Sequence, residues 1–288
     1  LQIDSLLLPE INDKLSSISE LEEILPVKIW SGSNSWALSG NRSVSGKALL
    51  ENDTHIGIQQ PAVWYEAYLE SPGFRFYGNF LAGFPFAPIG HTMFHGWGLT
   101  MLENDDLDFF LEKTNPDDST LVFANDHWEK ISTRTEIINV KDSASVTMTC
   151  RATHHGPICS DVMPEFKTMT TSPVSACWTF LKFNNNLMEA TWRLAHSKSM
   201  NEFRDAVSTI AAPGLNIVYA DAENNIAWYT AAKFVIRPKG VNASVLLDGT
   251  GANDWQGYYD FEMNPKQENP ELGFVLSANN DPQIDTTD

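Results

Sequence analysis

At the stretch Gly32-Ser33-Asn34-Ser35-Trp36-Ala37-Leu38 the pattern of apolar residues changes from one typical of helices to one typical of strands. Before it, leucine and isoleucine recur at helical spacing between acidic residues, which predicts one or two amphipathic helices that stop at Pro26. After it, short aliphatic and aromatic runs alternate with polar turns, as is typical of antiparallel strands. The sequence therefore predicts a helical leader over residues 1–32 and a largely antiparallel sheet domain over residues 33–288.

Individual elements follow from the same patterns. Residues 35–38 and 47–50 flank the polar segment 39–46, which predicts a hairpin. A second hairpin is predicted from 216–221 and 226–229 around a polar turn. Further strands are predicted at 63–69, 74–77, 131–140 and 145–149. The one helix expected in the second half begins at the capping pattern Ser199-Met200-Asn201-Glu202 and continues to Ile210.

The amino-acid composition excludes several classes of protein. Hydrophobic residues make up 42% of the chain and charged residues 19%, which indicates a globular protein rather than a disordered one. The net charge of −18 and the lack of a Lys/Arg cluster argue against a nucleic-acid binder. The sequence contains no run of about 18 apolar residues, so it predicts no membrane-spanning helix. Three cysteines fit no zinc motif, although one bridge, such as Cys150 to Cys159, is compatible with an oxidising compartment.

The N-terminus of the sequence lacks both a start methionine and the basic and apolar regions of a signal peptide. We therefore expect this chain to be a piece of a longer precursor, with its targeting information upstream.

Several short segments resemble a known family in the same order along the chain. They are Gly32–Trp36, Leu50–Gly57, Gly90-His91 with Gly96–Thr100, Asn104–Asp108, His155-Gly156-Pro157, Asn216–Asp221, Trp255-Gln256-Gly257, Glu262–Pro265 and Ser277–Asn280. Together they are similar to the penicillin acylase (penicillin amidase) family of N-terminal nucleophile hydrolases. The match corresponds to the N-terminal portion of the β chain with the end of the preceding spacer. The resemblance implies an α+β fold, the four-layer αββα sandwich, here as its core fragment.

The resemblance implies that Ser33 is the nucleophile. In such enzymes the precursor, a zymogen, cuts itself before this serine, and the freed α-amino group then acts as base for its own hydroxyl. That is chemically reasonable, because an α-amine has a pKa of about 7.7–8. Gly32 leaves the carbonyl before Ser33 sterically open. An uncut chain, in which the Ser33 nitrogen is an amide, is therefore expected to be inactive.

The implied activity is hydrolysis of a linear amide in an N-acyl small molecule through an acyl-serine intermediate. Candidate substrates are β-lactam antibiotics with their side chains, acyl-homoserine lactones and similar compounds. The oxyanion donors implied by the family are the backbone N–H of Met101 and the side chain of Asn279. The resemblance also implies that His55 lies near the nucleophile, whereas a histidine after a turn-like Asn-Asp-Thr is otherwise typical of a surface or structural position. The substrate-binding positions implied are Ile56, Ile89, Leu99, Trp192 and Leu215.

The family match also implies a structural Ca²⁺ site at Asp105, the Leu107 carbonyl and Asp108. Taken alone, the acidic loop 104–108 is equally compatible with a solvated surface, although closely spaced carboxylates and a carbonyl suit this ion. Related proteins complete the site with a carbonyl near Ala243, an aspartate near or past the C-terminus and a glutamate of an α chain. That α chain, cut from the same precursor, is the expected partner, and a periplasmic or secreted location is implied.

Two alternatives remain open. The first is a non-catalytic, β-rich ligand-binding domain whose aromatic pocket holds a ligand without converting it. The second is a relative with a cysteine nucleophile, which is disfavoured because none of the three cysteines follows a plausible cleavage point.

Overall fold

The computed structural model describes residues 32–57, 59–280, 282 and 284. The helices expected before residue 32 lie outside these residues. Two compact units make up the described part, a larger unit of residues 32–104, 183–234 and 259–284 and a smaller unit of residues 105–182 and 235–258. The sequence patterns predicted one continuous domain after residue 33. Because the described chain passes from one unit to the other four times, no single shift in composition marks a boundary between them.

The larger unit contains two antiparallel sheets. A seven-stranded sheet has the order β18-β14-β13-β6-β5-β4-β3, and a three-stranded sheet has the order β19-β1-β2. The strands of the first are β3 Trp64–Ser71, β4 Phe74–Leu81, β5 Ile89–Thr92, β6 His95–Met101, β13 Leu215–Asp221, β14 Ile226–Ala231 and β18 Lys266–Glu268. The second consists of β1 Gly32–Leu38, β2 Leu49–His55 and β19 Phe274–Ser277. Short 3-10 turns lie at Gly40–Arg42 (η2) and Phe261–Met263 (η4).

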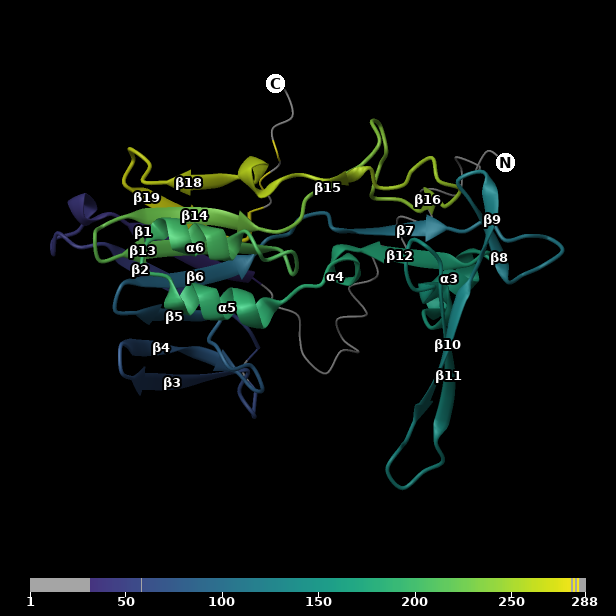
Figure 1. Ribbon diagram of the computed structural model, residues 1–288, viewed down its shortest axis with the longest axis horizontal. Coiled ribbons are helices and arrows are strands. Elements are labelled where there is room, and N and C mark those ends of the chain that lie inside the picture. The colour runs from purple at the N-terminus through teal and green to yellow at the C-terminus, as the bar shows by residue number, and fades with distance from the viewer. Residues whose placement is uncertain (1–31, 58, 281, 283, 285–288) are drawn as a thin grey trace. The chain divides into compact units, whose positions relative to one another are not determined.

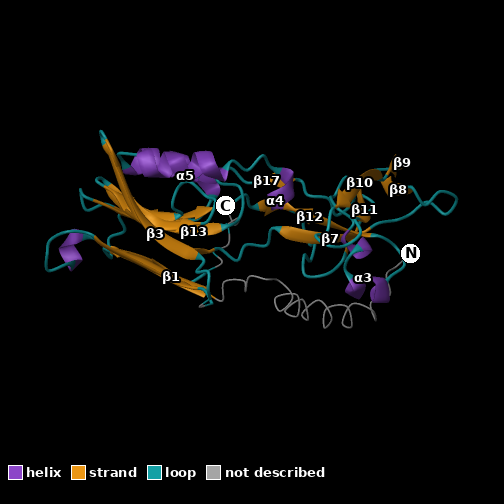
Figure 2. Ribbon diagram, turned by 90° about the horizontal axis from the view of Figure 1, so that it is seen from below, coloured by secondary structure: helices purple, strands orange, loops and turns teal. Residues whose placement is uncertain are grey.

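Helices α5 (Leu187–His196) and α6 (Met200–Val207) cover one face of the seven-stranded sheet, and β1 lies on the opposite side (Figures 1 and 2). The interface between the helices and the sheet is aromatic, with Trp97 and Tyr219 of the sheet and Phe203 of α6 fully buried. Between the two sheets Ala37, Val218 and Val275 pack together. The larger unit therefore has three successive layers, helix, sheet and sheet, with β13 buried on both faces.

The predicted hairpins are confirmed. Leu38 pairs with Leu49 at the turn between β1 and β2, and Ala220 pairs with Ile226 between β13 and β14. The predicted strands in 63–69, 74–77, 131–140 and 145–149 also form. Helix α6 begins as predicted, because the Ser199 side chain accepts a hydrogen bond from the Glu202 N–H.

The expectation of a single helix in the second half was wrong. Helix α5 precedes α6, and the Asn186 side chain caps it by accepting from the Glu189 N–H. Its buried face is formed by Ala190, Leu194 and their neighbours at helical spacing. The triple asparagine before it had masked the start of this helix.

The smaller unit is built around β7 (Leu107–Leu111), which pairs antiparallel with β12 (Val174–Trp178) and parallel with β16 (Leu247–Asp248). Three two-stranded ribbons complete its sheets, β8 Leu121–Ala124 with β9 His127–Lys130, β10 Ser132–Ile138 with β11 Val146–Ala152, and β15 Val235–Ile236 with β17 Gly257–Tyr258. Its helices are short, α3 Pro164–Met169, α4 Thr179–Lys182 and the 3-10 turn η3 Cys159–Asp161.

The predominance of antiparallel sheet with few helices agrees with the predicted fold class. All three cysteines are free thiols in the described chain, so the bridge between Cys150 and Cys159 is not formed here. Among the described residues, no helix has the length and apolarity needed to cross a membrane.

Candidate active site

Ser33 lies at the start of β1, in a strand whose side chains alternate between outside and inside. Ser33, Ser35 and Ala37 point inward and are each at most 1% exposed. The Ser33 hydroxyl donates to the carbonyl oxygen of Gly32 at 2.7 Å, so it lies against the peptide group that precedes it. Gly32 has a φ of +154°, a backbone conformation that side-chain-bearing residues rarely adopt.

Asn279, just after β19, reaches the same junction. Its side-chain amide donates to the Ser33 carbonyl at 2.9 Å. The amide nitrogen also lies 3.4 Å from the point where a side chain on Gly32 would begin. Its Oδ1 atom is buried and has no hydrogen-bond partner among the described residues. Asn279 adopts a φ of +60°, a left-handed conformation that asparagine tolerates better than most residues.

The direction of the Met101 backbone N–H follows from the register of β6 with β13. Leu102 donates to Gly214 in β6–β13 pairing, and alternate residues of an antiparallel pair point their N–H groups in opposite directions. The N–H of Met101 therefore points away from β13, on the same side as that of Leu99. The pairing of β6 with β5 ends at Trp97, four residues earlier. An N–H in this position can donate a hydrogen bond to an incoming oxygen.

Two asparagines inside strands position these groups, and sequence reasoning gave neither of them a role. Asn52 on β2 donates to the carbonyls of Asn34 (3.0 Å) and Leu99 (2.9 Å), which joins β1 to β6. Its Oδ1 accepts from the Leu99 N–H at 3.3 Å. Gly98 leaves room for this approach, since a side chain there would begin 2.6 Å from the Asn52 Cβ.

Asn216 on β13 is fully buried and joins the two backbone segments that carry the candidate oxyanion donors. Its side-chain amide donates to the carbonyls of Met101 (3.1 Å) and Asn280 (3.2 Å). Its Oδ1 accepts from the indole N–H of Trp228 at 2.9 Å. The only sequence signal for this role was an asparagine at an inward-facing strand position.

His55 ends β2 directly opposite Gly32 in the strand register. Its Nδ1 lies 3.5 Å from the point where a Gly32 side chain would begin, and its Nε2 lies 3.0 Å from the Asp53 carboxylate. The Asn34 amide is 3.4 Å from the same Nε2. The imidazole therefore lies beside the Gly32–Ser33 junction and is oriented by an acid that sequence reasoning did not single out.

An apolar cavity of about 330 Å³ lies between the seven-stranded sheet and α5. The strands contribute Leu99, Met101, Leu215 and Ile217, and the helix contributes Leu187 and Leu194. Thr191 also lines the cavity, but its hydroxyl donates to the Leu187 carbonyl at 2.8 Å. The cavity shares Met101 with the candidate oxyanion donors.

Of the five predicted substrate-binding residues, Leu99 and Leu215 line this cavity. The structure does not bring the other three to it. Ile56 follows β2, and Ile89 is half-buried opposite Asn79. Trp192 is 46% exposed and stacks on His196 at 4.2 Å between ring centroids. Roles in substrate binding for these three stay predictions.

The three predicted calcium ligands lie in the smaller unit, at and before the start of β7. The Asp108 side chain is fully buried, and its Oδ2 accepts from Arg237 Nε (2.7 Å) and Trp255 Nε1 (2.5 Å). Its Oδ1 has no hydrogen-bond partner in the described part of the chain. The exposed Asp105 carboxylate lies 3.2 Å from the Arg237 guanidinium. An orphaned, buried carboxylate oxygen suits a cation, so these residues fit the ion, with Arg237 already offsetting part of the negative charge.

Comparison with known proteins identifies relatives that are similar in sequence to this chain. An acyl-homoserine lactone acylase, QuiP, of Pseudomonas aeruginosa is 30% identical over 254 residues, covering 86% of this chain and 30% of the relative. A penicillin G acylase of Escherichia coli is 30% identical over 255 residues, covering 88% of this chain and 29% of the relative. The chain thus spans about a third of the length of these curated relatives.

The fold is also found among solved structures. A thermostable penicillin G acylase from Alcaligenes faecalis superposes with a TM-score of 0.77 at 28% sequence identity, covering 88% of this chain and 45% of that one. The family model described as penicillin amidase matches residues 3–287. Because this match extends over nearly the whole sequence and the architecture agrees, the chain belongs to the penicillin amidase family.

Proposed function

We propose that this chain carries the catalytic centre of an amidohydrolase that cleaves linear amides of N-acyl small molecules, with Ser33 as nucleophile. The observation that carries the proposal is the buried Ser33 hydroxyl 2.7 Å from the Gly32 carbonyl oxygen, with the Asn279 amide at the same junction. A serine at a strand start has no structural need for this arrangement. Membership of the penicillin amidase family supports the same reaction class.

Maturation comes first. The Ser33 Oγ attacks the Gly32 carbonyl carbon, the bond from that carbon to the Ser33 nitrogen breaks, and the hydroxyl proton passes to the departing nitrogen. Water then hydrolyses the resulting ester, which frees the Gly32 carboxyl group and the Ser33 α-amine. Gly32 favours this step because it carries no side chain that would block the approach of the hydroxyl.

Turnover repeats the attack on an external amide. The α-amine of Ser33 takes the hydroxyl proton, Oγ adds to the substrate carbonyl, and the amine product leaves with a proton. Water then releases the acid from the acyl-serine. The Met101 N–H and the Asn279 amide hold the oxyanion, each contributing roughly 3–4 kcal/mol. His55, oriented by Asp53, stabilises the position of Ser33 or its amine.

The apolar cavity supports an alkyl or aryl acyl group as the part of the substrate that is recognised. Its walls are mainly aliphatic and aromatic, and the hydroxyl of Thr191 donates to a carbonyl within α5. β-Lactam side chains and acyl-homoserine lactones both carry such groups. The relatives named for acyl-homoserine lactones and for penicillin G keep both classes open.

Calcium, an α chain cut from the same precursor and a periplasmic or secreted location form part of the proposal. Asp105, the Leu107 carbonyl and Asp108 would hold the ion, which adds fixed positive charge at the start of β7 and takes no part in the reaction. The orphaned Asp108 Oδ1 supports this assignment.

The decisive experiment is mass spectrometry of the full-length precursor and its Ser33→Ala variant. We expect the wild type to split between Gly32 and Ser33 and the variant to stay whole and inactive. Asn279→Ala should still be cleaved but lose roughly 10²–10³ in kcat through loss of one oxyanion donor. Cleavage retained in Ser33→Ala would sink the assignment, and an intact wild type that binds N-acyl ligands without turnover would favour a ligand-binding domain.

A second experiment determines which acyl groups the enzyme prefers. The matured enzyme is assayed on one amine carrying acyl groups from acetyl to dodecanoyl and phenylacetyl, beside Leu99→Phe. Because Leu99 lines the cavity, the larger side chain should shift the preference toward shorter acyl groups. An unchanged profile would place the acyl group elsewhere.

A further inference from the structure

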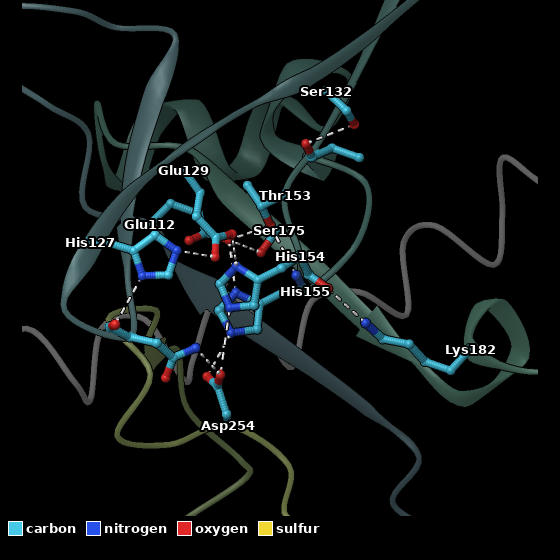
Figure 3. Close-up of polar contacts among 12 residues, drawn as sticks. Glu112, His127, Glu129, Ser132, Thr153, His154, His155, Ser175, Lys182 and Asp254 are labelled. Carbon is cyan, nitrogen blue, oxygen red and sulfur yellow. Dashed lines mark hydrogen bonds and ion pairs between the residues drawn. The ribbon is translucent and has the colours of Figure 1, made fainter.

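A compact group of histidines and acids lies in the smaller unit and takes no part in the proposed reaction. His154 and His155 follow β11, and Asp254 lies in the loop before β17. Figure 3 shows the two imidazoles side by side, with Glu112 and Glu129 on one side of them and Asp254 on the other. The ring centroids of the two histidines are 3.8 Å apart. Four separate segments of the chain, which carry Glu112, Glu129, the two histidines and Asp254, therefore meet in one small volume.

His155 is held from both ends. Its Nδ1 lies 3.0 Å from Glu112 Oε1, and its Nε2 lies 2.9 Å from Asp254 Oδ1. The ring is 3% exposed and stacks on Phe110 at 3.8 Å between centroids. The same Glu112 oxygen accepts from the hydroxyls of Thr153 (2.7 Å) and Ser175 (2.5 Å), which fix the carboxylate in place.

His154 repeats this arrangement with the second glutamate. Its Nδ1 lies 3.6 Å from Glu129 Oε2, and its Nε2 lies 3.6 Å from Asp254 Oδ2. In both histidines, therefore, Nδ1 faces a glutamate and Nε2 faces the one carboxylate of Asp254. A purely structural ion pair would need only one of these two rings.

We propose that His154 Nε2, His155 Nε2 and the Asp254 carboxylate form a site for Zn²⁺ or a similar divalent transition-metal ion. The three ligand atoms all lie within 4.8 Å of one another. Two donors bound at about 2.1 Å to a tetrahedral zinc ion lie about 3.4 Å apart. His155 Nε2 lies 2.9 Å from Asp254 Oδ1 and His154 Nε2 lies 3.6 Å from Asp254 Oδ2, so each imidazole is at a comparable distance from one oxygen of this carboxylate.

The surroundings match those of bound histidines in proteins. A metal-bound imidazole usually donates its other N–H to a carboxylate, which fixes the ring orientation. Glu112 is at hydrogen-bond distance from His155 Nδ1, and Glu129 lies on the Nδ1 side of His154 at 3.6 Å. Two imidazoles with one carboxylate favour zinc and its neighbours over calcium, which prefers oxygen ligands. His154 is 26% exposed and Asp254 27%, so an ion and a water as fourth ligand can reach the site.

A bound ion would tie the turn after β11 to the loop before β17. That loop is already closely fitted, because a side chain on Gly251 would begin 2.5 Å from the Asn125 Oδ1. The Asn125 amide in turn lies 3.5 Å from Asp254 Oδ2. The expected role of the metal is therefore to stabilise the smaller unit.

The rival account is that a proton holds the group together. Burial lowers the pKa of His155, but its hydrogen bonds to Asp254 and Glu112 outweigh this and raise the pKa overall. An imidazolium between two carboxylates accounts for His155. A protonated His155 does not explain why His154 also lies between a glutamate and Asp254.

The test is a zinc titration of the purified full-length protein, stripped of metals and then kept in excess Ca²⁺. Isothermal titration calorimetry should give one Zn²⁺ per chain, and Tm should rise with zinc concentration by mass action. His154→Gln should weaken zinc binding at least tenfold and abolish the rise in Tm. The partly exposed position of His154 makes this variant the one expected to fold normally, which circular dichroism checks.

His127→Gln is the matched control. Its Nε2 lies 2.9 Å from Glu129 Oε1, in the same group, but it is not one of the three ligands. This variant should bind zinc like the wild type. If zinc does not bind saturably, or if His154→Gln binds it unchanged, the proposal is overturned and the group is held by protons alone. None of these readouts depends on acylase activity, so the outcome is separate from that of the proposed function.

Discussion

The side-chain amide of Asn216 donates to the carbonyl oxygen of Met101 at 3.1 Å and so anchors the end of β6. Asn216→Ala removes this bond and the one to Asn280, which shifts both candidate oxyanion donors. We expect kcat to fall by roughly 10²-fold with little change in KM, since small displacements of catalytic groups have effects of this order.

Asn225→Ala is the control for that experiment. Asn225 lies in the turn of the β13–β14 hairpin and donates to Asp221 at 2.8 Å, so its loss also costs stability. It should lower Tm without affecting kcat. Equal kcat values for the two variants would remove Asn216 from the positioning role.

The Asp53–His55 pair predicts an effect on activity without an effect on stability. Both side chains are about half exposed, so Asp53→Asn should leave Tm unchanged. Loss of the charge that orients the imidazole should slow precursor cleavage and turnover by roughly tenfold. Glu51→Gln, on the outward face of the same strand, is the control and should cleave at the wild-type rate. Normal cleavage in Asp53→Asn, measured by gel electrophoresis over time, would falsify the pairing as functional.

Calcium should stabilise the protein through Asp108. By mass action, a ligand at about 100 times its Kd adds about 2.7 kcal/mol to the free energy of unfolding. Asp108→Asn should abolish this dependence on calcium in thermal melts. The variant will also be less stable without calcium, because Arg237 loses a buried partner. The deciding quantity is therefore the change of Tm with calcium concentration. Asp117→Asn, on an exposed loop, is the control and should respond to calcium like the wild type. If calcium does not change the Tm of the wild type, Asp108 serves only as the partner of Arg237 in a salt bridge.

His95 predicts a pH dependence of stability. Burial lowers its pKa to about 4, although its hydrogen bond to the Leu194 carbonyl and the charge of Asp221 act in the opposite direction. Because the unfolded histidine protonates near pH 6.5, the unfolded state binds the proton first as pH falls. The contribution is complete above pH 6.5 and is lost progressively down to about pH 4, by about 3 kcal/mol in total.

His95→Phe should remove this part of the acid sensitivity, because phenylalanine can pack against Trp97 and Tyr219 without titrating. Urea unfolding at pH 7 and pH 4.5 measures the difference. His91→Gln, at an exposed position, should follow the wild type. If wild type and His95→Phe lose equal stability on acidification, His95 is not the responsible group.

The hairpins could be predicted from the sequence because their signals are local, an alternating pattern on either side of a polar turn. The division into two units could not, because each unit is assembled from separated segments. Helix α5 was missed because its cap, Asn186, lies in a run of asparagines that is typical of loops.

The candidate site shows the same contrast. Ser33 and Asn279 were named from motifs and lie together in the structure. Asn52 and Asn216 were overlooked, because their hydrogen-bond partners lie on other strands and cannot be deduced from the local sequence. The group around His155 was likewise invisible, since Glu112 and Asp254 meet it from distant parts of the chain.

The pairing of Ser35 in β1 with Ser277 in β19 has a consequence for synthesis on the ribosome. β1 is among the first described segments to emerge, but its second neighbour is translated almost at the end of this sequence. Contacts so distant along the chain form late, because the intervening residues must be ordered first. Asn279 follows the same strand. The Gly32–Ser33 bond is therefore expected to stay intact in nascent chains that end before residue 277, so self-processing follows the synthesis of β19 rather than that of β1.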